Sequence, residues 1–265
     1  MTTPKTTVRV AALGDLHFGK GSQGTFLNLF TQVSEHADVL LLCGDFTDYG
    51  LPDEARGLVK DMTSALRIPV LAVLGNHDYH SGRHEEIAAI LGDAGLIVLD
   101  GDAHEVLGIG FAGVKGFGGG FGPRALGPWG EDIFKRFVHE AVEEALKLES
   151  ALARLRTPHR IVLLHYAPVQ ATAEGEPLEI YPFLGSSRLE EPINRYHVSA
   201  VVHGHAHRGQ PEGATATGVP VYNVSLPLMT RLSPERPFRV LELPRALEQK
   251  AAEPSDLAPA PASAL

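Results

Sequence analysis

The sequence predicts an α/β fold with parallel strands, and three patterns support this prediction. Short apolar runs bounded by glycine are typical of strands buried on both faces, and through the first half of the chain they alternate with helix-like segments. Five of the runs also end in side chains of the metal-ligand type. These runs are Val8–Leu13, Val39–Cys43, Val70–Leu74, Ile161–Leu164 and Val198–Val202. Because the topology can bring the carboxyl ends of such strands to one edge, the polar side chains can converge on one site.

Three helices are predicted between the early strands. Pro52–Leu66 opens on a proline followed by Asp53 and Glu54, which favours a first helical turn. Thr25–His36 and Arg83–Ala94 also carry helical patterning. Together with the strands they indicate βαβ units.

After Leu96 the pattern changes to short strands joined by glycine turns, followed by a glycine-rich stretch and a long helix. The helix, Glu131–Leu155, is rich in residues with high helix propensity. The short strands are predicted at Leu96–Leu99, His104–Leu107 and Ile109–Val114, and later ones at Arg160–Leu164, Val198–Val202, Val219–Val224 and Phe238–Leu243.

The composition is that of an ordinary globular domain. Of the 265 residues, 44% are apolar and 21% charged, so one domain over residues 1–245 can bury a core of its own. Residues 246–265 are rich in alanine and proline and are predicted to be a disordered tail. The formal net charge of −9 disfavours extended nucleic acid as a partner. The sequence leaves the oligomeric state open.

Two further features indicate a cytoplasmic protein that does not enter a membrane. Met1–Thr7 lacks the apolar core of a signal peptide, and no apolar run reaches membrane-spanning length. Cys43 is the only cysteine, which excludes an intrachain disulfide and a cysteine-based zinc site. We expect its side chain to be buried as a small apolar group.

The candidate metal ligands number seven and occur in five short motifs. Oxygen ligands suit hard cations, whereas imidazole suits manganese, iron, zinc and nickel. A mixed set therefore fits two adjacent ions better than one calcium or one structural zinc. The residues are Asp15, His17, Asp45, Asn76, His165, His205 and His207. Asp45 lies in the middle of the series and is the candidate for a carboxylate that bridges the two ions.

The order Asp-x-His, Gly-Asp, Gly-Asn-His-Asp, His and Gly-His-x-His resembles the calcineurin-like metallophosphoesterase superfamily. The resemblance implies a four-layer α/β/β/α sandwich with a dinuclear metal site at the C-terminal edges of the strands. It also implies two divalent ions (Mn, Fe, Zn or Ni), with manganese favoured. Asp15, His17, Asp45 and His207 would hold one ion, and Asp45, Asn76, His165 and His205 the other. His77 matches the family's non-ligand catalytic histidine, and Asp78 its orienting carboxylate.

The predicted function is metal-dependent hydrolysis of phosphate esters by a metal-bridging water or hydroxide. Thr47–Tyr49, followed by Gly50, resembles the cyclic-nucleotide phosphodiesterase branch, so small phosphodiesters are the favoured substrates. A phosphomonoesterase acting on proteins or small molecules is the main alternative. A nuclease and a non-catalytic scaffold are further alternatives. No ligand is missing from the motifs, which argues against the scaffold.

Two segments could form the walls of the site. Gly116–Gly130 is either a lid that carries Trp129 or a plain surface connection, and both interpretations stand at this point. Gln170–Ser187 directly follows the motif of His165 and could provide the opposite wall. We expect Asp48 and His203 to support the ligands without binding metal.

Overall fold

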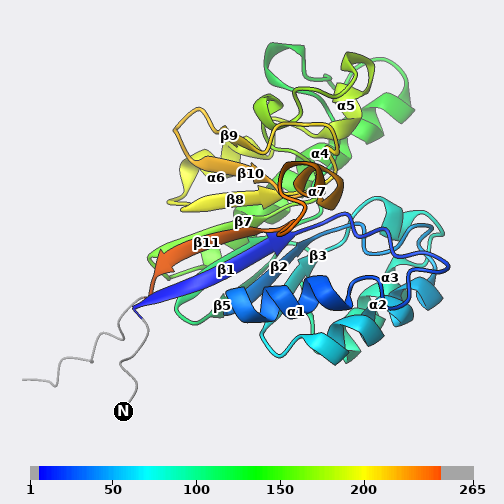
Figure 1. Ribbon diagram of the computed structural model, residues 1–265. Coiled ribbons are helices and arrows are strands. Elements are labelled where there is room, and N and C mark those ends of the chain that lie inside the picture. Colours follow the sequence, from blue (N-terminus) through cyan, green and yellow to red (C-terminus); the bar gives the residue numbers. More distant parts are fainter. Residues whose placement is uncertain (1–5, 246–265) are drawn as a thin grey trace, which may run out of the picture.

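Two β-sheets face each other in the computed structural model, which describes residues 6–245 (Figure 1). The first sheet has the order β11-β1-β2-β3-β4, in which β1 to β4 are parallel and β11 is antiparallel to β1. Its strands are β1 (Thr7–Leu13), β2 (Val39–Cys43), β3 (Val70–Val73), β4 (Ile97–Val98) and β11 (Arg239–Pro244).

The second sheet has the order β5-β6-β7-β8-β10-β9, with a parallel centre and antiparallel edges. Its strands are β5 (Asp102–Val106), β6 (Ile109–Gly113), β7 (His159–Leu163), β8 (Ala200–His203), β9 (Glu212–Ala214) and β10 (Pro220–Asn223). The hairpin between β5 and β6 turns at Leu107 and Gly108, which both have positive φ.

Helices cover the outer face of each sheet, which gives the four layers that the resemblance implied. On the first sheet these are α1 (Leu27–His36), α2 (Pro52–Ala65) and α3 (His84–Asp93). The second sheet is covered by α4 (Asp132–Arg154) and α6 (Glu190–Arg195), whereas α5 (Tyr181–Leu184) and α7 (Leu226–Leu232) lie in connections. No helix in the described part of the chain is long and apolar enough to span a membrane.

The apolar runs predicted as strands are buried on both faces, and β2 shows why. Leu40 and Leu42 pack toward the helices of the first sheet, whereas Leu41 and Cys43 pack between the two sheets. Side chains alternate along a strand, so an unbroken apolar sequence fills both cores at once. The predicted burial of Cys43 is confirmed, and burial raises the pKa of its thiol.

The edge of the sandwich where β1 ends is joined by main-chain hydrogen bonds. The Gly14 N–H donates to the carbonyl of Val224, and the Leu226 N–H donates back to the carbonyl of Gly14. The Val224 N–H in turn donates to the carbonyl of His203 at the end of β8. Main-chain hydrogen bonds therefore connect the two sheets at this edge.

The predicted elements are confirmed with shifts of one or two residues at their ends, and the strand predicted at Leu96–Leu99 shortens to β4. Four short elements were not predicted, namely β9, α5, α6 and α7. The strand predicted at His104–Leu107 begins at Asp102 and ends at Val106, because Leu107 takes the left-handed turn conformation. The missed elements are too short to show a periodicity. The tail predicted at 246–265 lies outside the described residues.

Candidate metal centre

All seven candidate ligands lie where a strand ends, in the connections after β1, β2, β3, β7 and β8. Their side chains, with that of His77, form three overlapping clusters whose possible ligand atoms lie within 4.8 Å of one another. The clusters are Asp15–His17–His207, His17–Asp45–His77 and Asp45–His165–His205. The seventh residue, Asn76, joins them through its Oδ1, which lies 2.8 Å from Nε2 of His165.

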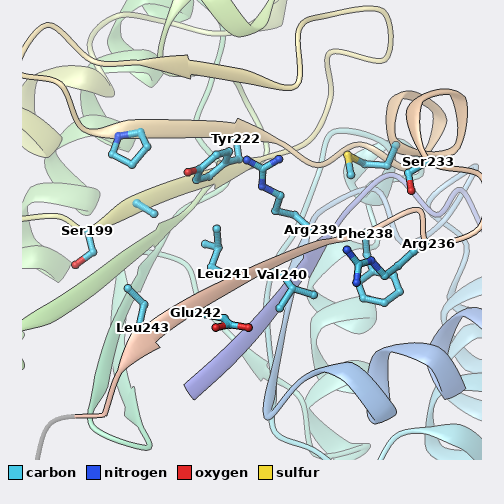
Figure 2. A pocket seen from close by; sticks show the side chains of 13 residues that line it. Ser199, Tyr222, Ser233, Arg236, Phe238, Arg239, Val240, Leu241, Glu242 and Leu243 are labelled. Carbon is cyan, nitrogen blue, oxygen red and sulfur yellow. The ribbon is translucent and has the colours of Figure 1, made fainter. Parts of the chain in front are cut away.

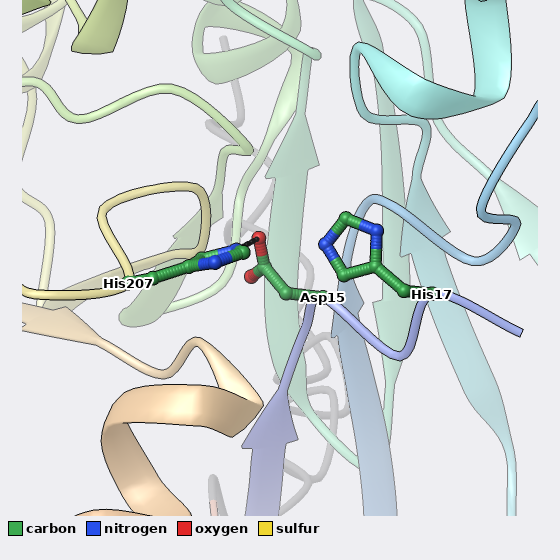
Figure 3. Close-up of side chains that lie close together, drawn as sticks. All are labelled: Asp15, His17 and His207. Atoms are coloured by element: carbon green, nitrogen blue, oxygen red, sulfur yellow. Dashed lines mark hydrogen bonds and ion pairs between the residues drawn. The ribbon is translucent and has the colours of Figure 1, made fainter.

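The first cluster is drawn in Figure 3, where Asp15 lies between the two histidines. Nε2 of His207 lies 3.0 Å from Oδ1 of Asp15. The backbone N–H of His205 donates to the same carboxylate at 2.9 Å. Asp15 is thus tied to both histidines of the Gly-His-Ala-His motif, although they lie 190 and 192 residues away in the chain.

Asp45, the carboxylate predicted to bridge two ions, is shared by two of the three clusters. Its Oδ2 lies 3.7 Å from Nε2 of His17, and its Oδ1 lies 3.5 Å from Nε2 of His165. The two oxygens therefore face residues predicted for different ions. The backbone N–H of His77 also donates to Oδ1 at 2.8 Å and fixes the carboxylate in place.

The backbone is strained at four of the predicted ligands. Asp15, His17, Asp45 and His205 have φ angles of 59°, 43°, 51° and 68°. Among the described residues other than glycine, only Leu107 shares this left-handed conformation. Each such residue costs on the order of 1–3 kcal/mol, and strain of this kind concentrates at functional sites.

Two glycines make room for the carboxylates. A Cβ on Gly75 would lie 2.2 Å from Oδ1 of Asp45, and one on Gly204 would lie 2.2 Å from Oδ2 of Asp15. No larger residue fits at either position without moving a carboxylate.

Burial sets the protonation of the cluster. It raises the pKa of Asp45, and the nearby charge of Asp15 adds to the increase. It lowers the pKa of His17, His165 and His205, the last to about 3. For His207, burial lowers the pKa, but the hydrogen bond and charge of Asp15 outweigh it and raise the value overall. Neutral imidazoles next to buried carboxylates that repel each other are suited to bind cations.

The donor atoms also fit metal ions. Nε2 of His17 is buried and has no hydrogen-bond partner among the described residues, and such an orphaned atom needs an explanation. His165 directs Nδ1 to the carbonyl of Cys43 at 2.8 Å, which leaves its Nε2 facing Asp45 and Asn76. His205 directs Nε2 to the carbonyl of Phe183 at 3.0 Å, which leaves Nδ1 available. Metal-binding histidines are commonly oriented through their second nitrogen in this way.

The predicted catalytic histidine, His77, belongs to the cluster that it forms with His17 and Asp45. Nδ1 of His77 lies 2.7 Å from the carbonyl of Asp48, which leaves Nε2 as the ring nitrogen not used in this contact. The ring of His77 packs edge-on against His17, with 4.4 Å between centroids.

The predicted role of Asp78 as the carboxylate that orients His77 is wrong. Its oxygens accept hydrogen bonds from the backbone of Phe46, Thr47 and Gly75 and from the Thr47 hydroxyl, at 2.7–3.3 Å. The carboxylate is completely buried and ties the turn after β2 to the turn after β3. The short 3₁₀ turn η1 (His77–Tyr79) holds the two neighbouring side chains apart, and the Asp48 carbonyl orients the imidazole instead.

Of the two residues expected to support the ligands, Asp48 contacts a candidate ligand and His203 contacts Thr172. Nδ1 of His17 is 3.6 Å from a carboxylate oxygen of Asp48. His203 is fully buried, and its Nε2 is 2.8 Å from the Thr172 hydroxyl. Tyr166 was missed, although it directly follows His165, and its ring lies 4.6 Å from that of His205.

The two predicted wall segments differ. Phe183, in Gln170–Ser187, reaches the centre through its carbonyl bond to His205. Trp129, in Gly116–Gly130, is 81% exposed and lies in a cavity with Leu126 and Phe134.

A groove of about 560 Å³ lies elsewhere, along β11 and facing β8 and β10 (Figure 2). Arg239 stacks over Tyr222 at its centre, 4.1 Å from the ring centroid. None of the seven candidate ligands lines this groove. The chemistry-bearing residues are at the strand ends, so the groove is not the candidate site.

Carboxylates and imidazoles that could bind metal ions cluster at the carboxyl ends of strands from two facing sheets, and this arrangement is that of a metal-binding α/β protein. The family model described as calcineurin-like phosphoesterase matches residues 8–209, and the chain belongs to this family. It is accordingly a metal-dependent phosphoester hydrolase. No curated protein matches the chain in a sequence search.

Solved structures share the fold at low sequence identity. Phosphopantetheinyl hydrolase from Mycobacterium tuberculosis aligns with a TM-score of 0.66 and 16% identity, over 89% of this chain and 96% of that one. A protein from Thermus thermophilus aligns with a TM-score of 0.55 and 13% identity, over 89% and 99%. A putative 5′-nucleotidase from Staphylococcus aureus has a TM-score of 0.51 and 16% identity, over 82% of this chain and 48% of its own.

Proposed function

We propose that the protein hydrolyses small phosphodiesters at a centre of two divalent ions, with manganese favoured. The observation that carries the proposal is the position of Asp45, whose two oxygens face His17 on one side and His165 on the other. Seven donor side chains, four of them imidazoles, also exceed what one transition-metal ion commonly binds in proteins.

Two bound ions would supply charge stabilisation for the phosphoryl oxygens and a water of lowered pKa. Asp15, His17, Asp45 and His207 would hold one ion, and Asp45, Asn76, His165 and His205 the other. The protein's own contribution is orientation. The carbonyls of Cys43 and Phe183 fix the rings of His165 and His205, and glycines leave the carboxylates room.

His77 is assigned to the leaving group. Its Nδ1–H donates to the carbonyl of Asp48, so the ring is held while Nε2 can carry a proton to the departing alkoxide. A positioned acid is most useful for an alcohol of high pKa, which leaves poorly without a proton.

The preference for a diester over a monoester rests on the resemblance of Thr47–Tyr49 and Gly50 to the cyclic-nucleotide phosphodiesterase branch. Arg231 donates to the carbonyl of His207 and so places a cation next to the centre. A monoester dianion gains affinity from such a cation, which keeps the phosphomonoesterase as the main alternative. The net charge of −9 also disfavours long nucleic acid. The names of the structural relatives cover both a phosphopantetheinyl hydrolase and a putative nucleotidase.

The test compares bis(p-nitrophenyl) phosphate with p-nitrophenyl phosphate on protein reconstituted with manganese, iron, zinc or nickel. We expect the diester to have the higher kcat/KM by about tenfold or more, which corresponds to about 1.4 kcal/mol. A faster monoester would replace the phosphodiesterase proposal with its main alternative. Hydrolysis of neither ester with any of the four metals would refute both.

A further inference from the structure

Several large apolar side chains are exposed on one side of the metal centre. Single exposed apolar residues are normal in a folded protein, but a contiguous set marks a binding surface. We name this set the apolar rim. It consists of Trp129, Ile133, Phe134, Leu178, Ile180 and Phe183. Leu178 and Phe183 are 74% and 58% exposed.

The rim is continuous across two segments that are distant in sequence. The rings of Phe183 and Phe137 lie 5.9 Å apart and join α5 to α4. Phe134 and Ile133 lie one turn before Phe137 on the same helix, so they extend the contact along its surface. Phe134 and Trp129 then line one cavity of about 290 Å³.

The backbone of Phe183, at the inner end of the rim, contacts the metal centre. The carbonyl of Phe183 accepts the hydrogen bond from Nε2 of His205. From the other side, Tyr166 packs against His205 and Phe117, with 4.6 and 5.9 Å between ring centroids. Phe117 in turn lies 4.9 Å from Phe137, beneath the rim. An unbroken series of aromatic contacts therefore connects the ligands to the exposed surface.

The backbone below the rim is firmly held. The Gly119 N–H donates to the carbonyl of Pro182 at 2.6 Å, and the Ala167 N–H donates to that of Leu184 at 3.0 Å. A Cβ on Gly185 would lie 2.0 Å from the carbonyl oxygen of Ala167. Hydrogen bonds from Gly119 and Ala167 thus hold the backbone of α5 in place, and its apolar side chains face solvent in a preformed arrangement.

We propose that the apolar rim binds an apolar group of the substrate, so that the preferred ester joins phosphate to an alkyl or aryl chain. This inference rests on the proposed function of the same centre. Its basis is continuity, because a chain esterified to a phosphate at His205 would meet Phe183 first and could continue toward Phe134. Apolar area removed from water would then contribute to binding.

The test measures the Kd of methyl, butyl and hexyl phosphate by calorimetry on manganese-loaded protein. These ligands carry a single apolar group and differ only in its length. Full burial of a methylene corresponds to about a fourfold gain in affinity, and about twofold is expected on a half-open surface. Hexyl phosphate should therefore bind roughly 30-fold more tightly than methyl phosphate.

Phe183→Ala should weaken hexyl phosphate binding by about tenfold and leave methyl phosphate nearly unchanged. The His205 contact survives this substitution, because its acceptor is the backbone carbonyl of Phe183. Leu146→Ala is the matched control. Leu146 is 52% exposed on the same helix as Phe134, about 18 Å further along the axis, and its removal should change neither Kd.

Equal Kd values for the three phosphates would overturn the inference, as would equal effects of Phe183→Ala and Leu146→Ala. The rim would then contact something other than substrate. These outcomes are separate from failure of the proposed function, because binding is measured without turnover. If the protein binds hexyl phosphate tightly but hydrolyses no ester, the inference about the apolar rim stands and the proposed phosphodiesterase activity is refuted.

Discussion

The ligand-bearing turns and the apolar rim meet at His205 and Phe183, yet they are built in opposite ways. The turns bury their carboxylates and His165, half-bury the other imidazoles, accept left-handed backbone at four ligands and are tied together by main-chain donors. The rim exposes its side chains and has ordinary helical backbone at α4 and α5. Groups that perform the chemistry are fixed by strain and hydrogen bonding, while groups that contact the variable part of a substrate are displayed on the surface.

The largest effect is expected where the turns from both sheets share a ligand. Asp45→Asn should lose both ions together and lower kcat/KM by roughly 10⁴-fold, because metal charge stabilisation is worth several kcal/mol. Elemental analysis of the reconstituted protein measures the metal content. His205→Ala and His207→Ala serve as controls, since each should lose mainly one ion. Two ions retained in Asp45→Asn would contradict the bridging role.

His77 should affect catalysis and leave metal loading intact. His77→Ala should keep both ions and lower kcat by roughly 10²–10⁴-fold, the usual contribution of a positioned acid. The loss should be larger for an alkyl ester than for a nitrophenyl ester, which needs little protonation. An equal loss for both leaving groups would mean that His77 stabilises phosphoryl charge. If the His77→Ala protein is depleted of metal, His77 is a metal ligand.

Asp78→Asn should behave differently from His77→Ala, because the Asp78 carboxylate joins the two turns and does not touch the imidazole. We expect reduced metal content and a similar loss of activity for both leaving groups, by about 10–100-fold. Metal analysis and the two kinetic series decide this. A purely leaving-group-dependent loss would restore the role first predicted for Asp78.

Acid should lower the stability of the folded protein through His203, which is buried next to the ligand-bearing turns. Burial lowers the pKa of His203 to about 4, so the folded state binds this proton less readily than the unfolded state. The associated stability is present above pH 6.5 and is lost as the pH falls from 6.5 to 4, by up to roughly 3 kcal/mol. Urea unfolding with chelator present measures it. His203→Gln should flatten this part of the pH profile, and an unchanged profile would show that His203 is not responsible.

The smallest effect is expected at the outer end of the rim. Trp129→Ala should raise KM by less than about threefold and leave kcat nearly unchanged, because stacking on an exposed ring stabilises ground and transition states alike. Phe183→Ala, next to the centre, provides the comparison. If Trp129→Ala changes no kinetic constant, Gly116–Gly130 is a surface connection beyond Phe117.

The sequence predicted that the candidate ligands converge, because they follow buried strands and strand ends are set by topology. Asp15, Asp45 and His165 could be assigned to one site without knowing a single distance. The partner of Asp78 could not, because it depends on how a three-residue 3₁₀ turn orients neighbouring side chains. The hydrogen bond between His205 and the carbonyl of Phe183 could not be predicted either, since a main-chain acceptor does not depend on residue identity. Whether Gly116–Gly130 is a lid or a surface connection could not be predicted either, because glycine content does not tell which way a loop points.

The hydrogen bonds that link Gly14, Val224 and Leu226 have a consequence for how the molecule opens. They lie at the same edge as the ligands, so main-chain hydrogen bonds join the two sheets at the metal centre. The far edge ends in the hairpin at Leu107 and Gly108 and in half-exposed strand residues. Slow opening motions should therefore begin at the far edge and reach the centre last. The amide protons of Gly14 and Val224 should accordingly be among the last to exchange with deuterated water, even in protein stripped of metal.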